Sequence, residues 1–333
     1  MPEVQTVNPV PIPWGGDRYM PIRMDSIRLD TTPDFALYFR PSPEQPFVLY
    51  CERNLPFTRA ARKRLENSRV SCLYIKQEER LEYNRYLANH LEDILRDPKL
   101  NVKEKSTILY DSAQAVVEEV LAQPPTRETI DRGKEVVQQT INFMTAEDFM
   151  IEHLLRAISC DYYLYTHSVN VVAYSVALAM RTGQRNSAML REIANGALLH
   201  DVGKRALNAA LLNKTTALSA EEWERMKTHP FEGHRMLREF GAIGEIALDI
   251  VLHHHEKLDG TGYPEGLKND AISPFVRMVS IADIFDALTT ERYHQKPHNT
   301  FEALKIMQRD MRSELDKDLL RAFVDVMAAR LKG

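Results

Sequence analysis

Apolar residues in the first third of the chain gather in short runs between turns. Four runs rich in β-branched and aromatic residues lie at residues 20–29, 35–40, 47–52 and 72–76, and the first three are separated by Asp/Pro clusters. This pattern predicts β-strands. Helical spacing of apolar residues appears around 57–67 and again over 79–95. We therefore expect a small α+β module over residues 1–98.

From about residue 100 onward the apolar positions take a helical spacing, and strand-like runs nearly vanish. An apolar stripe runs from Ile108 to Val120 before Pro124-Pro125 ends the helix, and a second helix is predicted over about 127–143. Thr145-Ala-Glu-Asp148 and Ser219-Ala-Glu-Glu222 have the form of capping boxes that open further helices. The sequence predicts a mainly α protein in which the α+β module precedes an all-helical domain.

Residues 99–144 are predicted to be connecting helices, and two interpretations of them stay open. They could transmit a signal or form a homodimer contact, but an ordinary packed helical pair explains the same apolar stripe equally well. The N-terminal module carries no recognisable chemistry. We expect it to have a regulatory or structural role, with a ligand that the sequence does not identify.

Composition excludes several classes of protein. The 333 residues include Lys+Arg 43 and Asp+Glu 47, a net charge of -4, so no overall basic field favours nucleic acid or an anionic membrane. The three cysteines form no CxxC pair, which excludes a cysteine-rich zinc module and fits a reducing compartment. No signal-peptide pattern and no long apolar span occurs. We expect a cytoplasmic protein.

Several histidines and acids lie at apolar or chain-bending positions of the helical region. His200 and Asp201 end an apolar stretch, His167 and Asp283 lie within apolar helices, and His229 precedes a proline. Each alone is best explained as a satisfied core or surface residue. Together they favour a shared partner, because buried charge needs compensation. A metal is the obvious candidate.

The segment HHHEKLDGTGYPEGL raises the question of which histidines could bind that metal. On a helix over residues 243–256, His254 lies in the apolar stripe, His255 at its edge, and His253 on the face of Asp249. This geometry favours His254, leaves His255 open and makes His253 the bystander. Asp259-Gly260-Thr261-Gly262 predicts a tight loop.

The order and spacing of these motifs resemble the HD-GYP family, a branch of the HD metal-dependent phosphohydrolases. The matching motifs are His200-Asp201-x-x-Lys204, His229-Pro230-x-x-Gly233, His254-His255-Glu256-x-x-Asp259-Gly260-x-Gly262-Tyr263-Pro264 and Asp283-x-x-Asp286-Ala287-Leu288. The resemblance covers residues 145–333, an HD-GYP catalytic domain, and not the N-terminal module. It implies an all-helical HD-type fold and hydrolysis of cyclic di-GMP to pGpG or GMP.

The resemblance also implies a site with two metal ions. One ion would be bound by His167, His200, Asp201 and Asp283, and the other by Asp201, His229, His254 and His255, so that Asp201 bridges them. A histidine-rich, carboxylate-bridged pair suits Fe or Mn. Asp201 and Lys204 would serve catalysis. Substrate would meet Lys204, Gly262, Tyr263 and Arg292, with Lys and Arg paired to phosphate oxygens.

Two departures from the family pattern bear on turnover. Tyr163 stands where some members have a glutamate for a third metal, so a binuclear centre is expected. Gln295 stands where a basic residue is frequent. The leading hypothesis is a cyclic di-GMP phosphodiesterase. One alternative is a catalytically weak cyclic di-GMP receptor that contacts a signalling protein through the GYP loop, the loop that contains Gly262-Tyr263-Pro264. The other is a phosphohydrolase of ordinary nucleotides.

Overall fold

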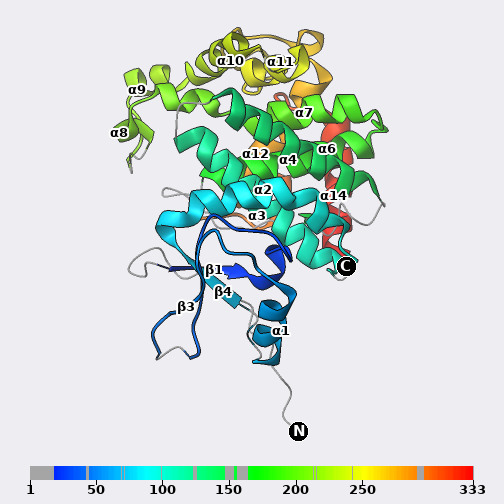
Figure 1. Ribbon diagram of the computed structural model, residues 1–333. Helices are drawn as coiled ribbons and strands as arrows, with labels where there is room; N and C mark the ends of the chain where they lie inside the picture. The colour runs from blue at the N-terminus through cyan, green and yellow to red at the C-terminus, as the bar shows by residue number, and fades with distance from the viewer. Residues whose placement is uncertain are drawn as a thin grey trace. The chain divides into compact units, whose positions relative to one another are not determined.

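The structure is a computed structural model, and its described part falls into two compact units. It describes residues 19–42, 45–68, 70, 72–98, 100–122, 126–146, 154–155, 164–212, 214, 216–241, 243–290 and 296–332. The units are Met1–Tyr86 and Leu87–Gly333, and the helix α2 (Arg80–Arg96) runs through the division. Each unit is described by itself, and Figure 1 shows the elements of both.

The N-terminal unit is built on a four-stranded antiparallel sheet. Its strands are β1 (Tyr19–Arg23), β2 (Leu37–Phe39), β3 (Val48–Cys51) and β4 (Cys72–Lys76), arranged in the order β1-β4-β2-β3. Leu37, Leu73 and Ile75 are fully buried, as expected for the inward-facing positions of a sheet with one covered face. All four predicted strands are therefore present.

The first predicted strand is shorter than its apolar run. β1 ends at Arg23, and the chain turns through the 3-10 helix η1 (Met24–Ser26). The Ser26 hydroxyl donates to the Arg23 carbonyl at 2.6 Å, and such a local bond competes with continued strand pairing.

The helix α1 (Arg59–Asn67) is capped by Thr58, whose side chain accepts the Ala61 N–H.

Among its described residues the second unit has only helices as regular elements, apart from an isolated β-bridge between Asp259 and Lys268. After α2 its longer helices are α3 (Val102–Ala122), α4 (Arg127–Ala146), α6 (Leu164–Arg181), α7 (Ser187–Leu199), α10 (His229–Phe240), α11 (Glu245–His253), α12 (Pro274–Thr289), α13 (Thr300–Arg309) and α14 (Lys317–Lys332). The shorter ones are η3 (Val202–Ala206), α8 (Ala209–Leu212), α9 (Ala220–Met226) and η4 (Asn269–Ala271). The predicted fold class, mainly α with a small α+β module, is confirmed.

The centre of the helical unit is α6, which packs on α7, α12, α3 and α14. Its buried residues include Val171, Val176 and Leu178, and its Tyr174 packs edge to face on Phe285 of α12, with ring centroids 5.2 Å apart. α11 packs on α7, and α10 packs on both α11 and η3. Figure 1 shows α10 and α11 side by side at one end of this unit.

Two predicted helix boundaries differ from the structure. Thr145 lies inside α4 and donates its hydroxyl to the Ile141 carbonyl at 2.7 Å, while Glu147 and Asp148 of the predicted capping box lie outside the described residues. The helix expected over 243–256 ends at His253, so His254 and His255 follow it. The capping box of Ser219 and Glu222 is confirmed at the start of α9. No described helix has the length and apolar character needed to cross a membrane.

Candidate metal centre

The predicted ligands come from five helices and the turns that follow two of them. His167 is carried by α6 and Asp283 by α12, while His200 and Asp201 follow the end of α7. The other ligands belong to α10 and to the turn after α11, where His229 is the first residue of its helix and His254 and His255 follow theirs. Helix ends thus supply most of the site.

Two glycines let the backbones of η3 and α10 touch, and this brings Asp201 to His229. A Cβ atom on Gly203 would lie 1.9 Å from the His229 carbonyl oxygen and 2.4 Å from the Gly233 nitrogen. A side chain at position 203 would therefore push the two segments apart. A Cβ atom added to Gly233 would lie 3.2 Å from a methyl carbon of Val251 and 3.3 Å from one of Val202. Both glycines are explained by close backbone approach.

The seven side chains form two groups whose ligand atoms lie within 4.8 Å of one another. One group is His167, His200 and Asp283, and the other is Asp201, His229, His254 and His255. The two carboxylate oxygens of Asp201 face different groups, because Oδ2 lies 3.4 Å from His200 Nε2 and Oδ1 lies 3.3 Å from His229 Nε2. The structure brings all seven predicted ligands together, with Asp201 between the groups.

Hydrogen bonds to the backbone fix the tautomer of three histidines. Nδ1 of His200, His229 and His254 lies 2.7, 2.8 and 3.0 Å from the carbonyl oxygen three residues earlier. A carbonyl oxygen only accepts, so each Nδ1 carries the hydrogen and each neutral ring presents a lone pair on Nε2. Partners of this kind orient the metal-binding histidines of known sites.

The lone pairs of His229 and His254 converge on one point. His229 Nε2 and His254 Nε2 face each other at 3.3 Å, and Asp201 Oδ1, buried beside them, accepts no hydrogen bond. Converging buried acceptors need a donor or a cation between them, and a metal ion satisfies them all at once. Neighbouring ligands of an octahedral ion with bonds of about 2.1 Å lie about 3 Å apart. The donor set therefore fits a transition metal.

The acids of the site are held in their charged form. Burial would raise the pKa of Asp201, but Lys204 and His200 outweigh it and hold that pKa well below its usual value. Burial also opposes ionisation of Asp283, and the hydrogen bond from His167 lowers its pKa well below normal. Burial would lower the pKa of His167, but its hydrogen bonds to Asp283 and Asp286 raise it to about 9. The carboxylates thus create a strongly negative field.

Two histidines of the second group, His254 and His255, stay neutral. Burial, followed by the neighbouring His255 and His200, holds the pKa of His254 well below its usual value. Burial lowers the pKa of His255 to about 3, although Asp283 opposes the shift. Neutral imidazole is the form that binds metals.

His253 stays outside both groups. Its Nδ1 donates to Asp249 Oδ1 at 2.7 Å, on the helix face that the sequence predicts. Burial alone would lower the pKa of His253, but the bond to Asp249 raises it.

The predicted substrate residues lie beside the ligands where the structure describes them. Lys204 donates to Asp201 Oδ2 at 2.5 Å, and its side chain is 23% exposed. The ring of Tyr263 covers that of His255, with centroids 4.7 Å apart. A Cβ atom on Gly262 would lie 2.5 Å from Glu256 Cα. Arg292, Tyr163 and Gln295 lie outside the described residues.

The carboxylate of Glu256 holds the GYP loop against the site. Its Oε1 accepts the backbone N–H groups of Glu265 and Gly266 at 2.7 and 3.0 Å, and its Oε2 accepts that of Leu267 at 2.9 Å. The peptide bond between Tyr263 and Pro264 is cis.

Sequence reasoning missed the residues behind His167. His167 Nδ1 lies 2.7 Å from Asp286 Oδ2, and Asn170 donates to Asp286 Oδ1 at 2.7 Å. Tyr110 donates to Asn170 Oδ1, also at 2.7 Å. The spacings His167-x-x-Asn170 and Asp283-x-x-Asp286 place these polar groups one helical turn from ligands, a signal that could have indicated Asn170 and Asp286. No local pattern indicates Tyr110.

Comparison with known proteins agrees with this arrangement. Residues 153–319 match the HD domain family. A solved HDG"Y"P protein from Bdellovibrio bacteriovorus superposes with a TM-score of 0.64 at 25% identity, over 93% of this chain and 99% of that one. The chain belongs to the HD domain family and, within it, to the HD-GYP proteins.

Curated relatives resemble this HD-GYP chain over part of their length. A cyclic di-GMP phosphodiesterase of Pseudomonas aeruginosa is 39% identical over 171 residues, which cover 51% of this chain and 41% of the relative. A 3'3'-cGAMP-specific phosphodiesterase of Vibrio cholerae is 27% identical over 243 residues, covering 70% of this chain and 52% of the relative. The chain thus spans about half the length of these relatives.

Proposed function

We propose that this HD-GYP protein is a binuclear-metal phosphodiesterase that hydrolyses cyclic di-GMP to pGpG, GMP or both. The observation that carries the proposal is the pair of ligand groups that meet at the two oxygens of Asp201. The name of the Pseudomonas aeruginosa relative supports the choice of substrate.

The ions in this proposal are Fe or Mn. His167, His200, Asp201 and Asp283 would hold one, and Asp201, His229, His254 and His255 the other. When bound, they would supply Lewis-acid stabilisation of the charge on the scissile phosphate.

The side chains around the ligands would bind and orient the substrate. The ammonium group of Lys204 reaches Asp201 and is partly exposed, so it can meet a phosphate oxygen at the edge of the site. Arg292 is proposed for the same role. Tyr263 remains neutral, because burial and the nearby Asp283 raise its pKa. Its ring and the backbone at Gly262 would shape the side of the pocket.

Metal stoichiometry tests the centre itself. We expect about two transition ions per chain by elemental analysis of anaerobically purified protein, none in Asp201→Ala and two in His253→Ala. His253 is the matched control because it adjoins His254 but pairs with Asp249. A third ion in the wild type, or metal loss in His253→Ala, contradicts the assignment.

Hydrolysis assays test the substrate. Metal-loaded protein is expected to cleave cyclic di-GMP faster than mononucleotides, and 3'3'-cGAMP is included because a Vibrio cholerae relative is named for it. Tight cyclic di-GMP binding without hydrolysis would support the alternative, a receptor that contacts a signalling protein through the GYP loop. The N-terminal module as a regulator, a homodimer and a cytoplasmic location stay predictions.

A further inference from the structure

The hydrogen-bonded chain behind His167 begins on a helix outside the matched HD segment. Tyr110 belongs to α3, whereas the family match starts at residue 153. From Tyr110 the chain passes through Asn170 on α6 and Asp286 on α12 to His167, by three hydrogen bonds of 2.7 Å each. All four side chains are buried. The tyrosine is thus connected to a predicted metal ligand through protein alone.

The direction of each bond is fixed by chemistry. The Asp286 carboxylate offers an acceptor oxygen to each of its two neighbours, so Asn170 turns its amide nitrogen toward Asp286. The amide oxygen of Asn170 then faces Tyr110 and accepts the phenol hydrogen. Tyr110 therefore fixes the amide orientation, and the amide fixes one oxygen of the carboxylate that orients His167.

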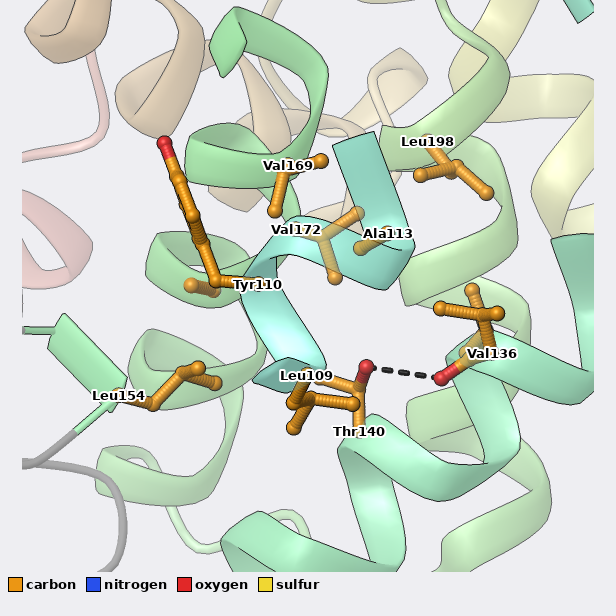
Figure 2. A pocket seen from close by; sticks show the side chains of 11 residues that line it. Leu109, Tyr110, Ala113, Val136, Thr140, Leu154, Val169, Val172 and Leu198 are labelled. Carbon is orange, nitrogen blue, oxygen red and sulfur yellow. Dashed lines mark hydrogen bonds between the residues drawn. The ribbon is translucent and has the colours of Figure 1, made fainter. Parts of the chain in front are cut away.

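Among the described residues that line the cavity beside the Tyr110 ring, only Thr140 carries another side-chain hydroxyl. The ring lines a cavity of about 10 Å³ between α3, α4, α6 and α7 whose other lining side chains are apolar except for Thr140. The Thr140 hydroxyl donates to the Val136 carbonyl at 2.8 Å. Figure 2 shows this bond and shows the Tyr110 hydroxyl turned away from Thr140 and Leu109. Loss of the phenol would leave the Asn170 oxygen without its donor.

A second contact ties α3 to the same site. Arg205, the neighbour of Lys204 in η3, donates to the Val120 carbonyl near the end of α3 at 3.0 Å. α3 therefore supports the candidate metal centre at two places, one behind His167 and one beside the segment that carries Lys204.

We propose that Tyr110 is a positioning residue for the metal ion held by His167, acting through Asn170 and Asp286. The inference rests on the metal role proposed for His167 but not on hydrolysis or on the identity of the substrate. The three hydrogen bonds reach only His167 among the seven predicted ligands, so the effect is expected on the ion that His167 would help to hold.

The test is a titration of metal-free protein with Co²⁺. Binding is measured by calorimetry and by the visible absorption of the bound ion. Tyr110→Phe is expected to lower the binding affinity for one of the two ions about tenfold. A change of this size is within the range found when an outer hydrogen-bond partner of a metal ligand is removed. The other ion should keep its wild-type affinity. Asn170→Ala is expected to weaken the same ion and confirms the route if Tyr110→Phe folds poorly.

The matched control is Val172→Ala, which removes apolar volume from the same cavity without touching the hydrogen-bonded chain. It should lower the melting temperature and leave both metal affinities unchanged. Unchanged affinities in Tyr110→Phe and Asn170→Ala, or equal weakening of both ions, would overturn the inference. Wild-type protein that binds no ion would contradict the proposed function as well as this inference. The two failures are therefore distinguishable, because the first is seen in the wild type and the second only in the variants.

Discussion

At the scale of single residues, the candidate centre depends on how each ligand is held rather than on which ligands are present. His200, His229 and His254 are each anchored to a carbonyl three residues earlier, so the local chain already orients them. This explains why sequence geometry could separate His254 from His253. The bond from His253 to Asp249 also lies within one helical turn.

Glu256 is the residue on which the GYP loop depends, because its carboxylate accepts three backbone N–H groups. Glu256→Gln replaces one acceptor oxygen by an amide donor that faces those N–H groups. We expect the free energy of unfolding to fall by about 1–3 kcal/mol, the cost of unpaired buried polar groups. The measurement is urea denaturation, with limited proteolysis between residues 259 and 268.

The control for this change is Glu245→Gln on the exposed first turn of α11. It alters the same chemical group at a position where the carboxylate holds no loop. The free energy of unfolding and the rate of proteolysis should stay near the wild-type values. Equal stability of the two variants would show that the loop does not need the carboxylate.

At the scale of elements, two helical glycines are expected to respond to alanine in opposite ways. A Cβ atom on Gly133 in α4 would lie 3.5 Å from Leu198 and 3.6 Å from Val116, which are ordinary contacts. Gly133→Ala should therefore stabilise the protein by about 0.5–1 kcal/mol, because alanine loses less backbone freedom on folding. On Gly196 in α7 the same atom would lie 2.8 Å from Ile250 Cβ, so Gly196→Ala should destabilise.

Urea midpoints of the two variants check this pair. Stabilisation by both changes would mean that α7 can move away from α11, and destabilisation by both would mean that α4 has no room beside Leu198.

The start of α14 provides a pH-dependent prediction. Asp316 Oδ1 accepts the N–H groups of Asp318 and Leu319, each at 3.1 Å, and Oδ2 accepts from Arg277 at 2.9 Å. Burial opposes ionisation, but the bonds from Leu319 and Arg277 outweigh it and lower the pKa of Asp316. Asp316→Ala should cost about 1 kcal/mol at pH 7, as for the loss of a helix cap.

The sign of the pH effect follows from the lowered pKa. The stability that Asp316 contributes is present above the unfolded pKa of about 3.9 and is lost as the pH falls through the lower folded pKa. The difference between wild type and variant, measured by urea denaturation, should therefore shrink below pH 4. Asp318→Ala, at a highly exposed position of the same turn, should show a much smaller difference at either pH.

The types of the elements could be predicted from the sequence, while several of their ends could not. Period and composition correctly indicated the four strands, the mainly helical character from about residue 100 onward, and helices such as α3 and α4. The ends at Arg23 and His253 and the position of Thr145 differ because single hydrogen bonds and turns decide them. A capping pattern such as Thr145 to Asp148 does not reveal whether the preceding helix continues through it.

At the scale of the whole molecule, the helical unit begins well before the matched HD segment. The unit starts at Leu87, and α3 and α4 pack against α6 and α7. The predicted bounds 1–98, 99–144 and 145–333 stay predictions, and fragments test them. A fragment of residues 87–333 should fold and bind metal. A fragment of residues 145–333 should lose its cooperative thermal transition, because removing α3 and α4 exposes Val169, Val172 and Leu198.

Circular dichroism melts and elemental analysis of both fragments check this expectation. A shorter fragment that melts cooperatively and holds two ions would show that α3 and α4 are dispensable.

The ligand set could be predicted because six of the seven ligands belong to motifs with their own spacing, and the family resemblance added His167. The hydrogen-bonded chain through Tyr110 could not, since it joins positions 60 and 116 residues apart on three helices. Such contacts are created by the packing of α3, α6 and α12, which no local pattern specifies.

The hydrogen bonds to Glu256 have one more consequence, for the way an anionic substrate is met. Backbone amides of consecutive residues that converge on one anion form the nest by which many loops bind phosphate. In this chain the nest of Glu265, Gly266 and Leu267 is already filled by the carboxylate of Glu256. The loop therefore presents Tyr263 as a shaped surface while its own amides neutralise an internal charge. The positive charge that attracts a phosphodiester must come from side chains and bound ions.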